Sequence, residues 1–220
     1  MTERARFGIV ISMNTDMWSG FGATERSLRT ETRNGVEVRV LVLQKRYAAP
    51  RPEVWHAVTT PERISRWLGP VSGELALGGR YQVEGNAGGT VLACDEPERL
   101  EVTWEFGGDV SWVLLTLADD GAGTRLVLEH SAEVDQEKYG EFGPGAVGIG
   151  WEMAFGALTK LLADPAFAPG EPDWTDPGYP AFVRESGAGW ELADVAAGAD
   201  PAQARTAAER CFAAYTTLPA

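Results

Sequence analysis

The sequence predicts an α+β fold in which a curved antiparallel sheet closes over one long helix. A series of short strands with turn residues between them occupies the middle of the chain. An apolar stripe at helical spacing follows at Gly145–Ala163. One strand and two short helices come before the series, so the simplest layered arrangement is a sheet that packs on one dominant helix.

The first regular elements are expected after the turn dipeptide Asn34-Gly35. Val36–Tyr47 predicts a strand with apolar side chains on both faces. Two short helices follow, one over Glu53–Thr59 and one from Pro61, a favourable residue in a first turn. Residues 1–35 lack sustained periodicity, and we expect them to form a flexible lead-in.

Six further strands are expected, with Gly-rich or Glu-Pro breaks between them. They are Val71–Leu75, Arg80–Glu84, Thr90–Asp95, Leu100–Phe106, Val110–Leu117 and Thr124–Glu133. In the fourth, Leu100, Val102, Trp104 and Phe106 alternate with polar residues, which is typical of an antiparallel strand with one buried face. In the last, the inward residues are Leu126, Leu128 and His130.

The long helix is predicted over Gly145–Ala163, between Pro144 and the stop signal Asp164-Pro165. Its apolar stripe consists of Val147, Trp151, Ala154, Phe155, Leu158, Leu161 and Leu162. Glu152 and Lys160 lie on the opposite side. Because a stripe with such large aromatic side chains needs a large apolar partner, we expect it to face the sheet.

The C-terminal part of the chain has a different composition. Residues 164–180 contain five prolines and predict a semi-rigid linker. Residues 181–220 predict a pair of helices with a break at Gly198–Pro201. The pair is too small for a domain, so we expect it to dock on the main fold, here taken as residues 36–163.

Charge and composition exclude several classes of function. The formal net charge of −13 argues against binding to nucleic acid or to an anionic membrane surface. No apolar run reaches the roughly 18 residues of a membrane span. Cys94 and Cys211 lie far apart and predict reduced thiols, so we expect a cytoplasmic protein. No pattern of metal ligands and no cofactor motif stands out, and Gly85–Gly89 lacks the lysine of a phosphate-binding loop.

Several segments resemble one family. Arg46–Pro70 is similar to the opening of bacterial homologues of the heat-shock-protein-90 ATPase activator, which belong to the SRPBCC (START-like) superfamily. Further segments match the family in the same order, namely Gly78–Tyr81, Asp95–Leu100, Gly123–Ser131 and Gly150–Glu152. The resemblance covers roughly residues 36–163, and the C-terminal pair resembles an extension of some actinobacterial members.

This resemblance implies the helix-grip fold, in which the sheet wraps around the long helix and the space between them can hold an apolar ligand. Members include lipid carriers, polyketide aromatase/cyclases, antibiotic self-resistance proteins and chaperone activators, so the fold does not decide the function. The candidate ligand-binding residues are Trp104, Phe106, Leu115, Leu128, His130, Tyr139, Trp151 and Phe155. The aromatic residues among them would either stack on a ligand or fill the core.

Three hypotheses follow. The leading one is a non-catalytic protein that holds a small apolar or aromatic molecule between sheet and helix. The second is an enzyme, such as a polyketide cyclase or dehydratase, with His130 as acid/base and Tyr139 as a helper. The third is a chaperone-associated interaction protein that uses the apolar outer patch around Trp112 and Leu114. The C-terminal pair or a second subunit could cover that patch, which leaves a homodimer open, and the alternative is that the patch is simply exposed.

Overall fold

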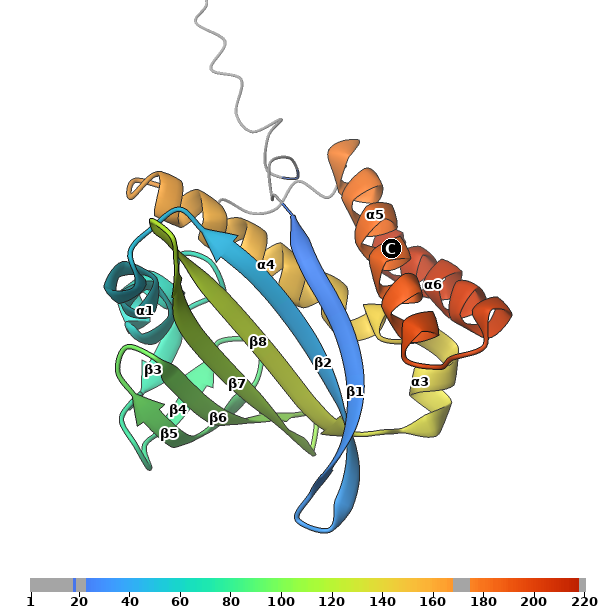
Figure 1. Cartoon of the computed structure of the whole chain (residues 1–220), viewed down its shortest axis with the longest axis horizontal. Coiled ribbons are helices and arrows are strands. Elements are labelled where there is room, and N and C mark those ends of the chain that lie inside the picture. The colour runs from blue at the N-terminus through green and yellow to red at the C-terminus, as the bar shows by residue number, and fades with distance from the viewer. Residues whose placement is uncertain (1–17, 19–22, 168–174, 218–220) are drawn as a thin grey trace, which may run out of the picture.

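The computed structural model describes Trp18, residues 23–167 and residues 175–217. The strands of this part of the chain form one antiparallel sheet in the order β1-β2-β8-β7-β6-β5-β4-β3 (Figure 1). Their bounds are β1 Thr24–Arg33, β2 Val36–Tyr47, β3 Val71–Gly73, β4 Arg80–Val83, β5 Gly88–Asp95, β6 Arg99–Phe106, β7 Asp109–Asp120 and β8 Gly123–Glu133. The strands predicted from Val36 onward are thus confirmed, with small shifts at their ends.

The helices cover one face of this sheet. They are α1 Arg51–Thr59, α2 Pro61–Ile64, α3 Gln136–Phe142, α4 Gly145–Ala163, α5 Gly178–Ala196 and α6 Pro201–Thr216. Figure 1 shows α4 lying along the curved sheet, with α1 at one end and α3, α5 and α6 at the other. The structure therefore confirms the α+β helix-grip fold and the predicted bounds of the long helix.

Sheet and helix meet in an apolar core. Antiparallel register aligns Leu43 of β2, Leu128 of β8 and Leu115 of β7 across the sheet, and all three side chains are buried. On α4, the residues Ile149, Phe155, Leu158 and Leu161 are at most 1% exposed. Burial of such side chains contributes about 1.5–3 kcal/mol each, so this layer is the main source of stability.

The expected flexible lead-in is wrong for residues 24–33, because they form β1 and pair with β2 along their whole length. Residues 1–17 and 19–22 lie outside the described part of the chain. The sequence of β1 is polar, and its charged side chains form ion pairs that hold much of the strand in place. Arg29 pairs with Glu129 of β8, and Arg33 pairs with Glu101 of β6, both at 2.6 Å. Hydrophobic periodicity cannot reveal such a strand.

The prediction for the two sides of α4 is wrong at two positions. Val147 was expected to face inward but is 44% exposed, whereas Glu152 was expected in solvent but is 5% exposed. Val147 lines open pockets at the start of α4, whereas Glu152 is covered by a side chain of β1. Arg26 of β1 donates two hydrogen bonds of 2.6 Å to the carboxylate of Glu152. The helix is consequently buried against the sheet, including its edge strand β1, and against α5.

The C-terminal pair packs on the end of α4. The indole of Trp190 on α5 is fully buried and lies directly against Gly148 of α4, whose small size permits the contact. Helix α6 begins at the N-cap Asp200 and packs on α5 and α3. Helix α5 begins at Gly178, inside the predicted linker, of which residues 168–174 lie outside the described part.

The outer patch at Trp112 is covered from within the chain. The guanidinium of Arg33 lies 4.4 Å from the centroid of the Trp112 ring and stacks on it. Trp112 and Leu114 are half-buried. Within the chain, Trp112 is covered by β1 and not by the C-terminal pair, so that part of the expectation is wrong, and cover by a second subunit stays a prediction.

One described helix, α4, is long and apolar enough by composition to cross a membrane. Half of that apolar stretch is buried inside the fold. The helix is buried because it lies between the sheet and α5. Its apolar composition is therefore that of a core helix.

Candidate functional site

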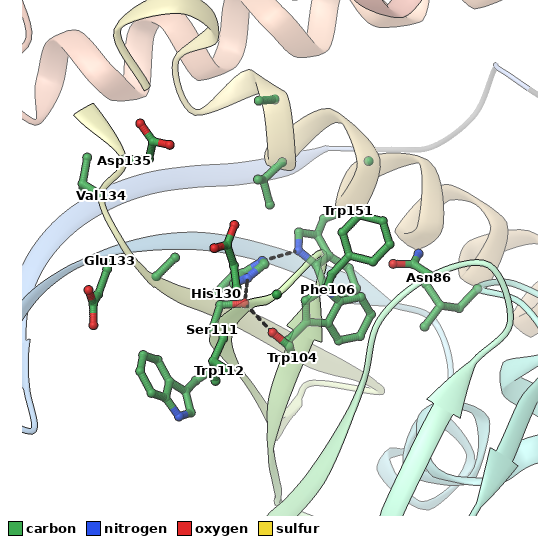
Figure 2. Close-up of a pocket in the computed structure, with 18 of the residues that line it drawn as sticks. Asn86, Trp104, Phe106, Ser111, Trp112, His130, Glu133, Val134, Asp135 and Trp151 are labelled. Atoms are coloured by element: carbon green, nitrogen blue, oxygen red, sulfur yellow. Dashed lines mark hydrogen bonds between the residues drawn. The ribbon is translucent and has the colours of Figure 1, made fainter. Parts of the chain in front are cut away.

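Three aromatic side chains meet where α4 crosses the open end of the sheet (Figure 2). They are Trp104 of β6, His130 of β8 and Trp151 of α4. The two indole centroids are 5.0 Å apart, and the imidazole centroid lies 6.0 Å from Trp151 and 6.4 Å from Trp104. These tilted and edge-on arrangements are the ones that aromatic pairs prefer.

A chain of hydrogen bonds fixes the orientation of the cluster (Figure 2). The indole N–H of Trp151 donates to His130 Nδ1 at 3.0 Å. Because an indole nitrogen can only donate, Nδ1 carries no proton and Nε2 carries it. His130 Nε2 then donates to Ser111 Oγ at 2.8 Å, and Ser111 Oγ donates to the Trp104 carbonyl at 2.9 Å.

His130 is therefore held as a neutral imidazole. Burial lowers the pKa of His130 from 6.5 to about 4, because the charged form would lose its hydration. Both ring nitrogens are engaged, which leaves no lone pair for a substrate in this arrangement. The residue acts here as an anchor that orients Trp151 and Ser111.

The burial of His130 makes the stability of the protein depend on pH. The unfolded chain takes up a proton on His130 below pH 6.5, whereas the folded protein resists protonation until about pH 4. The free energy of unfolding should therefore fall as pH is lowered through this window. In His130→Leu this contribution should disappear, and urea denaturation at several pH values would measure it.

His56 offers a matched control, because it is the other histidine of the chain and its side chain is exposed. His56→Leu should keep the pH slope of the parent protein. A parent slope that survives in His130→Leu would show that other groups cause it.

An open pocket of about 890 Å³ lies outside the aromatic cluster. Trp104 and Trp151 form its inner wall, and Phe106, which is 60% exposed, stands at its rim. Its carboxylates belong to the rim residues Asp109, Glu133 and Asp135. The pocket is large enough for a drug-sized molecule, for which ligand pockets of about 300–1,000 Å³ are usual.

The space enclosed between sheet and helix is much smaller. A pocket of about 60 Å³ lies on the inner side of Trp104 and Trp151, with Leu115 and Leu128 in its apolar wall. For comparison, an apolar cavity of about 150 Å³ holds benzene. The two indoles thus separate a large outer pocket from an interior with no room for a ring system.

Two other candidate residues line neither the outer pocket nor the inner one, although Tyr139 lines a third pocket beside α3. Phe155 lines none of these pockets and packs in the core, with its ring centroid 6.1 Å from that of Tyr47. Tyr139 of α3 donates a hydrogen bond of 2.5 Å to Asp194 of α5, and the Arg39 guanidinium lies 4.2 Å from its ring centroid. Burial raises the pKa of Tyr139 well above its usual value, so its hydroxyl stays protonated and ties α3 to α5.

Sequence reasoning missed Ser111 and α3. Alternation along β7 places Ser111 on the same face as Val113 and Leu115, so its position was predictable once His130 was assigned inward. The signal for α3 is Asp135, whose carboxylate caps the helix by accepting from the backbone N–H groups of Glu137 and Lys138.

Among the described residues, no group of three or more His, Cys, Asp or Glu side chains is arranged to hold a metal ion. Cys94 is exposed and Cys211 is buried, and both are free thiols. The groups that line the outer pocket are aromatic faces, one neutral imidazole, the rim carboxylates and neutral polar side chains such as Asn86 and Ser111.

A curved antiparallel sheet around a long helix, with an open pocket at its mouth, defines a helix-grip protein of the SRPBCC type. Residues 48–163 match the family model described as "Activator of Hsp90 ATPase homolog 1-like protein", and the chain belongs to this family. The resemblance seen in the sequence is thereby confirmed.

Two solved structures are similar over most of the chain. The crystal structure of CalU16 from Micromonospora echinospora is 35% identical, with a TM-score of 0.64 over 78% of this chain and 98% of CalU16. The solution structure of CalU16 gives 34% identity and a TM-score of 0.68 over 82% of this chain and 100% of CalU16. This similarity extends beyond the segment that matches the family model.

A more distant structure shares the fold alone. DynU16, a protein of the dynemicin biosynthetic locus, is 23% identical, with a TM-score of 0.52 over 57% of this chain and 48% of DynU16. No curated protein sequence matches the chain.

Proposed function

We propose that the protein binds a small apolar molecule with a flat aromatic ring system, and that the ring system stacks on Trp104 and Trp151. The observation that carries this proposal is the outer pocket of about 890 Å³ with two indoles as its inner wall. Aromatic surfaces stack with an interaction of about 0.5–1.5 kcal/mol beyond the burial of apolar area. The family membership supports the same general class, a helix-grip protein with a ligand.

The state of His130 supports binding over catalysis. A general base needs a free lone pair within hydrogen-bond distance of the proton it removes. Nδ1 of His130 accepts from Trp151, and Nε2 is protonated and donates to Ser111. A cyclase-like enzyme with His130 as acid/base would require this chain of bonds to break when the substrate enters.

The chaperone-associated hypothesis has less support. The outer patch that it would use is covered where Arg33 stacks on Trp112 and pairs with Glu101. The remaining support for the chaperone-associated hypothesis is the description of the family, which names an Hsp90 ATPase activator homologue.

Trp104→Ala should weaken the binding of a flat aromatic probe by about tenfold, equivalent to about 1.4 kcal/mol, because it removes the more exposed of the two indoles. A suitable probe is Prodan, a neutral naphthalene dye whose fluorescence reports an apolar environment. At 100 times its dissociation constant, the dye should also raise the free energy of unfolding of the parent protein by about 2.7 kcal/mol.

Leu77→Ala is the control, because Leu77 is 69% exposed and lines none of the pockets described above. It should leave the affinity for Prodan unchanged. Absence of binding to the parent protein, or full affinity in Trp104→Ala, would contradict the proposed site. Native mass spectrometry of protein purified from its host would identify a retained ligand and count the subunits.

A further inference from the structure

A third pocket lies on the other side of the first turn of α4. Its volume is about 300 Å³, and its walls come from β1, β2, β8, α3 and the start of α4. Leu28, Leu41 and Pro144 make its surface largely apolar. Leu28 and Leu41 are paired across β1 and β2 and lie outside the segment 48–163 that matches the family model. We call this pocket the side lobe.

The side lobe and the outer pocket share a boundary, because several residues line both of them. Both are lined by His130 and Ala132 of β8 and by Ala146 and Val147 of α4. Ala146 and Val147 are exposed, so the boundary between the two spaces is open to a ligand. The two pockets thus form a bent site that passes over His130.

The chemistry of the side lobe disfavours an anionic occupant. Its basic residues are both engaged, since Arg39 pairs with Asp194 at 3.5 Å and Lys138 pairs with Asp135 at 3.4 Å. Asp109, Glu133 and Asp135 line the boundary with the outer pocket. An anionic group would meet these carboxylates, whereas an alkyl chain would meet Leu28, Leu41 and Pro144.

We infer that the ligand has two parts, a flat ring system in the outer pocket and an uncharged aliphatic chain in the side lobe. This inference rests on the proposed function. A lobe of about 300 Å³ has twice the volume of an apolar cavity that holds benzene, about 150 Å³. It accommodates an alkyl chain of several carbons, which the inner pocket of about 60 Å³ does not.

Two dyes that share one ring system test the two parts of the proposed ligand separately. Prodan and Laurdan share the same neutral naphthalene and differ in the length of the acyl chain, which is short in Prodan and long in Laurdan. Leu28→Trp fills the side lobe from β1. We expect this variant to bind Laurdan at least tenfold more weakly than the parent protein and to bind Prodan within twofold of the parent.

A second variant obstructs the side lobe from α4 instead of from β1. Ala146→Leu narrows the boundary between the two pockets from α4 and should reproduce the selective loss of Laurdan. Leu192→Trp, at a residue of α5 that is 69% exposed and lines none of the pockets described, is the matched control and should change neither affinity. Circular dichroism and thermal unfolding establish that each variant is folded.

The outcomes distinguish this inference from the proposed function. If the parent protein binds neither dye, the proposed function fails. If the parent binds both dyes but neither folded variant loses Laurdan selectively, the outer pocket stands and the side lobe is overturned as a ligand site. A selective loss in either folded variant supports the ligand with two parts.

Discussion

Replacing Glu152 with glutamine is expected to lower the free energy of unfolding by about 3–5 kcal/mol, because the variant leaves the partly buried Arg26 and the buried Lys45 without their counter-charge. Glu152 is 5% exposed and accepts two hydrogen bonds of 2.6 Å from Arg26. Lys45, also buried, lies near this pair. Burial lowers the pKa of Lys45 from 10.5 to about 8, while the charge of Glu152 opposes that shift.

Urea denaturation measures this loss, and Glu31→Gln is the matched control. Glu31 also pairs with an arginine at 2.6 Å, but both partners, Arg29 and Glu31, are exposed by more than a third. Such a surface pair contributes about 0–1 kcal/mol. If the two substitutions cost the same, the ion pair beneath β1 is solvated and does not hold β1 on α4.

Gly148→Ala is expected to destabilise the protein by about 1–3 kcal/mol or more, because the added methyl group has no space. A Cβ at this position would lie 2.2 Å from Cε2 of Trp190 and 2.4 Å from Nε1. Trp190 is fully buried, so its ring cannot move without displacing α5 from α4. Thermal unfolding would measure the loss, and limited proteolysis would detect release of the α5–α6 pair.

Gly150→Ala, on the same helix, should not destabilise the protein. The nearest atom to a Cβ at Gly150 is the Tyr215 hydroxyl at 3.5 Å, which is an ordinary contact. Alanine is favoured over glycine inside a helix by about 0.8–1 kcal/mol, so this variant should be as stable as the parent or more stable. Equal destabilisation by both substitutions would mean that α4 tolerates no side chain in this turn, whatever the position of Trp190.

Much of the fold was predictable because its elements carry strong local patterns. The alternation at Leu100–Phe106 and the stripe over Gly145–Ala163 each identify one buried face, and the structure confirms both elements. β1 was not predictable in the same way. Its residues are held by ion pairs to β6, β8 and α4, and these partners are distant in the sequence.

The candidate site was predictable in part. Period-two alternation and helical spacing bring Trp104, His130 and Trp151 to one region, and the structure places them in contact. The same patterns could not tell whether these rings leave a cavity or fill it. In the structure the two indoles close the interior, and the large pocket lies outside them.

The sequence by itself determined the order of the elements, the faces that they bury and the family, because those properties depend on local periodicity and on short motifs. Only the tertiary structure decided which side of the indole pair is open, which residue covers Trp112, and that His130 is held neutral between Trp151 and Ser111. These properties depend on distances between side chains far apart in the sequence. Tertiary packing sets these distances, and the spacing of residues along the chain does not predict them.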